Sequence, residues 1–390
     1  MRIKSILVIA LMAIATVASA QRSNLSRAKS NYTKYSELKS MGTGTLSINE
    51  LNTAQSAIDR AIENEKTNEL AETWVYYALI YADLALLDTT EAAMATYQKA
   101  LDGRDKAISL DADNEHAENL GALNSMLAQF ELNKGAMAWE EGNYSEAYDS
   151  FEKGLTYLPG DTTLLYYAGI AAINDNKFDK AVSKYVELVP IDEYSNNRQI
   201  VLDASRLYLQ LGDTTNALKY AQIATEKYPE DAEIATHNIE LNLMAGNEEA
   251  ILETLQKQAE RSPNDKALQY YLGIAQASLN QNDEAIASYQ KALAIDPDYL
   301  EANINLGAAI LTKGINHYNE TNNKNLPQGE YEAEIKKAYD IFDTALPYLE
   351  KAVALDPNSI IALTNLKQYY DINDNEEKSA EIQAKIEALR

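Results

Sequence analysis

The sequence of 390 residues contains no cysteine and only three histidines. Disulfides and thiolate catalysis are therefore excluded, and a lipid on an N-terminal cysteine has no attachment point. His116, His237 and His317 lie far apart, so a histidine-based zinc site or a Ser-His-Asp triad lacks its material. Two carboxylates could still act together, but no pattern singles out a pair. We therefore expect no enzyme, no metal and no cofactor.

Basic residues and helix-breaking residues are also scarce. The chain has 34 Lys and Arg against 59 Asp and Glu, a formal net charge of −25. This charge repels nucleic-acid phosphates and anionic lipid headgroups, which excludes nucleic-acid binding. A basic partner and simple solubility both remain as reasons for the acidity. With only 15 Gly and 8 Pro, the composition is typical of helices joined by short turns.

One apolar run stands at the N-terminus. Arg2 and Lys4 precede the apolar residues 6–17, about 12 residues against the roughly 20 that span a bilayer. Ala18-Ser19-Ala20 is a small-x-small cleavage site. Residues 1–20 are predicted to be a secretory signal peptide cleaved between Ala20 and Gln21, with an uncleaved anchor as the alternative. The mature chain is then expected to be periplasmic or secreted, and to reach a membrane only through a partner.

The prolines repeat with a fixed period. Pro229, Pro263 and Pro297 are 34 residues apart, and Pro159 lies 70 residues before Pro229, two periods plus two. A period of 34 residues is typical of a helix–turn–helix repeat.

Other residues recur in the same phase. The copy from residue 266 contains Leu272-Gly273, Ala285, Tyr289 and Ala292, followed by Pro297. Earlier copies contain Gly135, Ala147 and Phe151, and Gly169, Ala181 and Tyr185. This order closely resembles the tetratricopeptide repeat. The resemblance covers residues 21–390 and implies an all-α fold, a right-handed superhelical solenoid of about nine antiparallel helix pairs.

The resemblance also implies how the pairs pack. Small residues should let the two helices of a pair approach closely, and large aromatic rings should fill the space between consecutive pairs. Proline after the second helix prevents that helix from continuing. The small positions are Gly135, Gly169 and Gly273, and the aromatic ones are Phe151, Tyr185 and Tyr289.

The predicted helix pairs follow from these positions. The first is 22–39 with 49–64, joined by a loop at 41–45, and the second is 71–87 with 90–110. Six further pairs end near Leu158, Val189, Tyr228, Arg261, Ile295 and Leu355. The last pair, 358–370 with 375–389, is expected to cap the array, because its outer face is polar. It lies within the capping segment 358–390.

Two copies depart from the pattern. The interval from Pro297 to Pro357 is 60 residues, and we interpret residues 314–330 as an insertion in which two lengthened helices are joined by a polar loop. Such a loop either carries contacts or is a tolerated surface excursion. In the copy from residue 232, Ile239, Ile251 and Gln258 replace residues that are usually small. This pair is predicted to sit slightly apart and to be the weakest part of the stack.

A partner-binding groove is implied by the family, on the inner face of the first helices. The fifth, ninth and twelfth places of several copies carry aromatic and apolar residues, as a docking surface for a helix or an extended peptide would. The alternative is that neighbouring repeats partly close this face. The candidate groove residues are Trp139, Tyr166, Ile170, Ile173, Leu202, Arg206, Leu209, Tyr270 and Ile274. Arg206 is the only base among them, so the clamp by which some family members hold a partner's carboxylate is absent.

Two short motifs have simple structural interpretations. Asp-Thr-Thr at 88–90, 161–163 and 213–215 is expected to cap helices, although it also resembles an acceptor motif for O-glycosylation in some bacterial periplasms. Residues 371–375 begin like a calcium loop, but Glu376 and Ile382 occupy the places of its glycine and its last carboxylate. We interpret this segment as a turn between helices.

The sequence therefore favours a scaffold that binds a protein or peptide partner in its groove. The alternative is a structural subunit of an envelope assembly that uses its convex faces and the insertion. A hydrolase or a glycan-binding module is disfavoured by the missing site chemistry.

Overall fold

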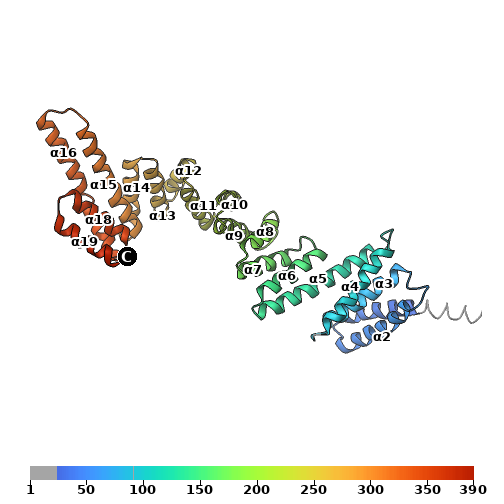
Figure 1. Cartoon of the computed structure of the whole chain (residues 1–390). Helices are drawn as coiled ribbons and strands as arrows, with labels where there is room; N and C mark the ends of the chain where they lie inside the picture. The colour runs from blue at the N-terminus through green and yellow to red at the C-terminus, as the bar shows by residue number, and fades with distance from the viewer. Residues whose placement is uncertain (1–23, 91) are drawn as a thin grey trace, which may run out of the picture. The chain divides into compact units, whose positions relative to one another are not determined.

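A computed structural model describes residues 24–90 and 92–390, which form α-helices and no strand (Figure 1). The predicted signal peptide, residues 1–20, lies outside the described residues. Among the described helices, none is both long enough and apolar enough to cross a membrane. The chain divides into two compact units, Met1–Leu211 and Gly212–Arg390.

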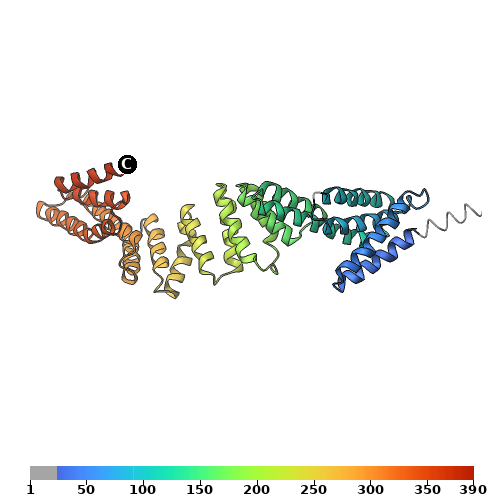
Figure 2. The same ribbon diagram turned by 90° about the horizontal axis from the view of Figure 1, so that it is seen from below.

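In both units consecutive helices run in alternating directions (Figure 2). The first unit contains a helix over residues 24–40, then α2 (Gly44–Ile62), α3 (Ala71–Leu87), α4 (Ala93–Leu110), α5 (Ala117–Glu140), α6 (Tyr144–Tyr157), α7 (Thr162–Asn174), α8 (Phe178–Leu188) and α9 (Asn197–Gln210). The second unit contains α10 (Thr214–Lys227), α11 (Ala232–Met244), α12 (Glu248–Arg261), α13 (Lys266–Ser278), α14 (Asn282–Ile295), α15 (Leu300–Asn322), α16 (Gln328–Asp343), α17 (Leu346–Leu355), α18 (Ile360–Ile372) and α19 (Glu376–Ala388). The predicted all-α helical repeat is confirmed.

The predicted loop at 41–45 is too long. Gly42 turns the chain with φ +73°, and the Thr43 carbonyl already accepts the amides of Leu46 and Ser47 at 3.0 and 3.2 Å. Helix α2 therefore begins at Gly44, five residues before the predicted start.

The eighth pair contains a break that the sequence analysis did not foresee. Pro347 has no N–H to donate to Asp343, and its ring crowds that carbonyl. The amides of Thr344 and Ala345 instead bond to the carbonyls of Ile341 and Phe342, three residues back, at 3.0 and 2.9 Å. The second helix is therefore split into α16 and α17, so residues 24–90 and 92–390 form one helix more than nine pairs would give. Residues 314–330 form the end of α15, a short loop and the start of α16, an arm that extends past the neighbouring helices of its unit (Figure 1).

Aromatic rings pack inside the helix pairs. Gly273 on α13 faces the ring of Tyr289 on α14, so a β-carbon at Gly273 would lie 2.6 Å from that ring. Gly135 faces Phe151, and Gly169 faces Tyr185, in the same way. The prediction placed these rings between consecutive pairs and did not include this contact within the pair. The missing β-carbon makes room for the ring of the partner helix in the same pair.

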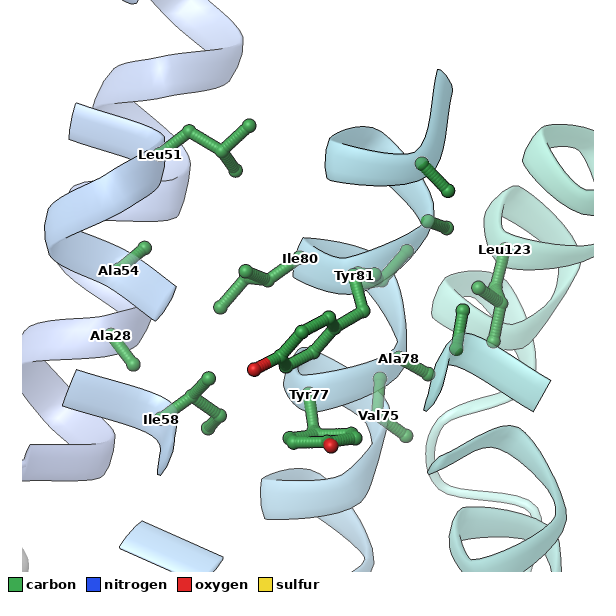
Figure 3. Packing of buried hydrophobic residues seen from close by; sticks show 14 of the residues in the cluster. Ala28, Leu51, Ala54, Ile58, Val75, Tyr77, Ala78, Ile80, Tyr81 and Leu123 are labelled. Carbon is green, nitrogen blue, oxygen red and sulfur yellow. The ribbon is translucent and has the colours of Figure 1, made fainter. Parts of the chain in front are cut away.

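A buried carboxylate fastens the first helix to α3. Asp83 is 3% exposed and accepts hydrogen bonds from the hydroxyls of Tyr32 and Tyr35 at 2.7 and 2.8 Å and from Lys39 at 2.7 Å. These three donors offset the cost of burying the charge. The apolar core lies beside this cluster: Figure 3 shows Ile80 of α3 pointing toward Ala54 and Ile58 of α2.

Aspartates cap several helices. Asp161 accepts the amide of Leu164 at 2.9 Å, and Asp213 accepts that of Asn216 at 3.0 Å, which satisfies free amides at the starts of α7 and α10. In the remaining copy Asp88 accepts the amide of Thr90 at 2.8 Å, and the Thr90 hydroxyl accepts the amide of Ala92 at 3.2 Å just before α4. Residues 371–375, which begin like a calcium loop, include the end of α18 and the turn before α19. Asp374 lies in this turn with φ +52°.

The pair α11–α12 has a small core. Helix α11 buries Ile234, Ile239 and Leu241, whereas α13 buries five side chains or glycines and α14 buries five. Fewer buried contacts lower the free energy needed for local opening. The pair that departs from the repeat pattern at Ile239, Ile251 and Gln258 thus buries fewer residues than the pair α13–α14.

We expect hydrogen exchange to be faster in α11 and α12 than in α13 and α14. The difference in protection should be on the order of ten-fold, since local opening exposes less apolar surface in the smaller core. Hydrogen-exchange mass spectrometry of peptides from residues 232–261 and 266–295 measures it. Equal protection in both pairs would contradict the prediction.

Candidate partner-binding groove

An apolar pocket of about 460 Å³ lies between α5 and α7, with α6 at its floor. Helix α5 contributes one face, because Leu132, Ala136 and Trp139 are separated by three or four residues. Helix α7 contributes Tyr167 and Ile170 by the same spacing. The remaining lining residues are Asn133 and Glu140 of α5 and Phe151 of α6.

The packing of the pocket fixes its shape. Phe151 is 2% exposed and lies against Gly135. The ring of Tyr167 has its centroid 5.8 Å from that of Phe151. Trp139 is held edge-on against Tyr144, with ring centroids 4.9 Å apart. These contacts give the pocket rigid walls, which is typical of preformed binding sites.

Apolar surface is exposed around the pocket. Tyr167, which lines the pocket, is 44% exposed, and Met137 of α5, which does not line it, is 61% exposed. Large apolar groups gathered around a concave site mark a place where a partner excludes water. Glu140 is the only charged residue among those that line the pocket in the described chain. The chemistry of the pocket is therefore apolar contact with one negative charge at its edge.

The structure brings two predicted groove residues together, Trp139 and Ile170. Ile173 and Leu209 are half-buried on α7 and α9, and Arg206 is exposed, 3.7 Å from Asp203 on its own helix. Leu202 is 0% exposed, so its prediction as a groove residue is wrong. Its side chain points into the core of the first unit.

Tyr166 does not line the pocket. Its ring stacks at 6.5 Å on the buried Tyr185 and lies 6.1 Å from Tyr194, which belongs to the connection between α8 and α9. These contacts favour the alternative in which neighbouring repeats partly close this face. Tyr166 is a half-buried ring at the edge of the core.

Tyr270 and Ile274 belong to the second unit and pack against its core. The ring of Tyr270 lies 5.0 Å from Tyr299 and 5.9 Å from Tyr289, and its hydroxyl accepts a hydrogen bond from Asn305 at 3.1 Å. Burial raises the pKa of Tyr270. Tyr270 is covered by Tyr299, which lies just before α15, the first helix of the next pair. Tyr194 covers Tyr166 in the same way.

Sequence reasoning missed Tyr167, Leu132, Asn133, Ala136, Glu140 and Phe151. Tyr167 could have been found from the buried positions of α7. The buried positions of that helix are Leu164, Leu165, Ala168, Gly169, Ala171 and Ala172, which leaves Tyr167 at the border of the buried side. The residues of α5 could not be found in this way, because this helix is far longer than one repeat helix, 24 residues against 13 for α7.

Within the described chain, no group of three or more His, Cys, Asp or Glu side chains is placed to hold a metal ion. His317 contacts Glu334 at 2.9 Å across the arm formed by α15 and α16. His116 lies at the start of α5.

Comparison with known proteins adds two matches within the chain. The tetratricopeptide-repeat family matches residues 202–256, and a family described as TPR repeat matches residues 273–314. The first segment contains Pro229, and the second contains Pro297 and the Gly273–Tyr289 pair. The chain is a tetratricopeptide-repeat protein.

Individual similarities to this tetratricopeptide-repeat protein are distant. The peroxisomal targeting signal receptor of Kluyveromyces lactis is 24% identical over 299 residues, which are 66% of the chain and 50% of the receptor. The chain thus spans half the length of the curated relative it matches.

Three solved structures share part of the chain. MamA is 20% identical, and the match covers 50% of the chain and 92% of MamA, with a TM-score of 0.38. YrrB, described as a TPR protein with an unusual peptide-binding site, is 18% identical, covers 55% with 96% of its own, and has a TM-score of 0.38. The C-terminal part of a TPR repeat-containing protein from Cytophaga hutchinsonii is 17% identical, covers 66% with 95% of its own, and has a TM-score of 0.46.

Proposed function

We propose that this tetratricopeptide-repeat protein is a non-enzymatic interaction scaffold that binds a peptide segment or a partner helix between α5 and α7. The observation that supports this most directly is the apolar pocket at Trp139 and Ile170, with Tyr167 exposed at its edge. The curated relative is named as a receptor for a targeting signal. Recognition of a polypeptide segment is the same general activity.

The pocket favours one large apolar anchor from the partner. Its volume of about 460 Å³ lies within the roughly 300–1,000 Å³ of small-ligand sites. An aromatic or branched aliphatic side chain that enters it would contact Trp139, Phe151 and Ile170. Glu140 and the net charge of −25 favour a basic residue beside that anchor, because opposite charges across an interface steer association.

The proposal includes no catalytic step and no cofactor. The three histidines lie on separate repeats, and the sequence has no cysteine, so the common nucleophile–base arrangements lack their residues. Binding through a preformed groove needs none of them.

The groove is tested by Tyr167→Ala combined with Ile170→Ala. Loss of two apolar contacts at the pocket is expected to weaken partner binding about ten-fold, or roughly 1.4 kcal/mol. Partners are first captured from envelope fractions with the wild-type chain and identified by mass spectrometry. The dissociation constant of the captured partner is then measured by calorimetry for both proteins.

Met244→Ala serves as the control, because Met244 is 72% exposed, belongs to the second unit and does not line the pocket. It should bind like the wild type. If the groove variant keeps its fold by circular dichroism and binds every partner unchanged, the groove is not the working surface. Assembly through the arm formed by α15 and α16 then becomes the hypothesis to test.

We also propose that the protein works outside the cytoplasm, in the periplasm or beyond. The support is the basic, apolar and small-residue order of residues 1–20. The protein purified from its native source is expected to begin at Gln21 and to be found in a non-cytoplasmic fraction. An intact Met1 in its mass spectrum would contradict this proposal.

A further inference from the structure

A second cleft lies in the second unit, between the second helices of two adjacent pairs, whereas the α5–α7 pocket lies between first helices. The second cleft has a volume of about 480 Å³ and runs between α10 and α12, with α11 as its floor. It contains no residue of the α5–α7 pocket. A binding role for this cleft is therefore independent of the proposed function.

The cleft coincides with a departure from the repeat pattern. Other pairs carry Gly, Ala and an aromatic residue at intervals of 12 and 4, as at Gly273, Ala285 and Tyr289. The pair α11–α12 has Ile239, Ile251 and Leu255 at these places. All three line the cleft. Two extra branched side chains between the helices keep α11 and α12 from approaching as α13 and α14 do.

The rim of the cleft is rich in amides and hydroxyls. Asn238 and Asn242 lie on α11, Gln222 and Thr225 on α10, and Gln258 on α12. A side-chain amide both donates and accepts hydrogen bonds in one plane, as a peptide unit does. Among the described residues that line the cleft none is acidic, and Lys219 is the only base.

Part of this hydrogen-bonding capacity is unused. The side-chain oxygen of Gln258 is buried and has no hydrogen-bond partner within the described part of the chain. A buried acceptor without a donor costs about 1–3 kcal/mol. The neighbouring amides are only partly engaged: Asn242 donates to Asn238 at 2.8 and 3.0 Å, and Asn247 reaches Asn242 only at 3.5 Å. A ligand N–H would give Gln258 the donor it lacks.

We propose that this cleft binds an extended, uncharged polypeptide segment through its backbone. The wall from Thr215 to Thr225 on α10 spans about 15 Å at 1.5 Å per residue. Four to five residues of extended chain, at roughly 3.3 Å each, match that length. Alternate side chains of the segment would rest on Leu218 and Ala250, which line the cleft and are accessible. Its amides would pair with Asn242 and Gln258.

Charge selects against other ligands. A single lysine in a chain of net charge −25 gives a poor site for phosphates or for an acidic peptide. A basic segment would find no carboxylate among the residues that line the cleft. A neutral carbohydrate presents donors and acceptors as well, and it is therefore included as the opposing outcome of the test.

The probe is acetyl-tetraalanine amide, added at millimolar concentration to the full chain labelled with ¹⁵N in Asn and Gln side chains. We expect it to shift the NMR signals of the Asn242 and Gln258 amides. The affinity should fall at least ten-fold in Gln258→Leu. In Gln256→Leu, which places the same change on the exposed side of α12, it should stay unchanged.

Gln222→Leu provides a second variant if Gln258→Leu fails to fold, since Gln222 is exposed and lines the opposite wall. Gln222→Leu should also lower the affinity for the tetraalanine probe, whereas Tyr167→Ala should leave that affinity unchanged. The proposal is overturned if the tetraalanine probe leaves these amide signals in place, or if Gln256→Leu and Gln222→Leu affect it equally. Shifts caused by chitotriose and not by the peptide would also overturn it.

Discussion

Gly273→Ala is expected to destabilise the second unit by about 2 kcal/mol. A β-carbon at this position would lie 2.6 Å from two carbons of the Tyr289 ring, which is 2% exposed and lies beside Tyr270. Overpacking of this kind costs roughly 1–3 kcal/mol or more, against a gain of about 1 kcal/mol from the better helix propensity of alanine. Hydrogen-exchange protection of α13 and α14 measures the result.

Gly329→Ala is the matched control in the same unit. Gly329 lies in the first turn of α16, and a β-carbon there would meet nothing within 4 Å. Alanine should stabilise the chain by about 0.5 kcal/mol, because it reduces the freedom of the unfolded state. If Gly273→Ala stabilises the protein as much as Gly329→Ala does, the ring of Tyr289 is not held against α13 as the structure shows.

The packing at Gly273 shows which features of the fold could be predicted from the sequence and which could not. The period of 34 residues and the order of Gly, Ala and aromatic residues predict the helices, and α3 was predicted at its observed bounds. The direction in which an aromatic ring packs could not be predicted. Spacing along the chain does not determine whether the ring lies within a helix pair or between two pairs. The break at Pro347 was missed because the prolines were interpreted as ends of repeats. Here a proline divides a helix that the arm had lengthened.

The candidate groove was predicted only in part, for a physical reason. Family positions place Trp139 and Ile170 on the accessible face, and they line the pocket. Tyr166 and Tyr270 occupy equivalent positions, but Tyr194 and Tyr299, from the connections that follow their helix pairs, cover them with ring centroids 6.1 and 5.0 Å away. Connections lie outside the repeat pattern, so their side chains could not be assigned to this face from the sequence. The covering tyrosines turn predicted groove anchors into parts of the core edge.

The tyrosines also determine how the protein responds to alkali, and its thermal midpoint is expected to fall steeply above pH 10. Burial is the main cause that raises the pKa of Tyr97, Tyr185 and Tyr289 above the ordinary value of 10.0. Above pH 10 these phenols stay protonated in the folded chain and ionise in the unfolded chain. The unfolded state then binds fewer protons, so stability falls as pH rises. Circular dichroism melts at pH 8, 9, 10 and 11 follow the change.

Tyr289→Phe isolates one of these groups. Phenylalanine keeps the ring over Gly273, so the variant should melt near the wild-type temperature at pH 8. Each buried tyrosine lowers the free energy of unfolding by about 1.4 kcal/mol per pH unit above its ordinary pKa, and a typical domain has only about 5–15 kcal/mol in total. The variant should therefore lose less stability than the wild type between pH 10 and 11. This window begins at the unfolded pKa and continues upward, so both proteins should behave alike below pH 9. Parallel losses above pH 10 would mean that the Tyr289 hydroxyl ionises as readily in the folded chain as in the unfolded one, which contradicts its burial between α13 and α14.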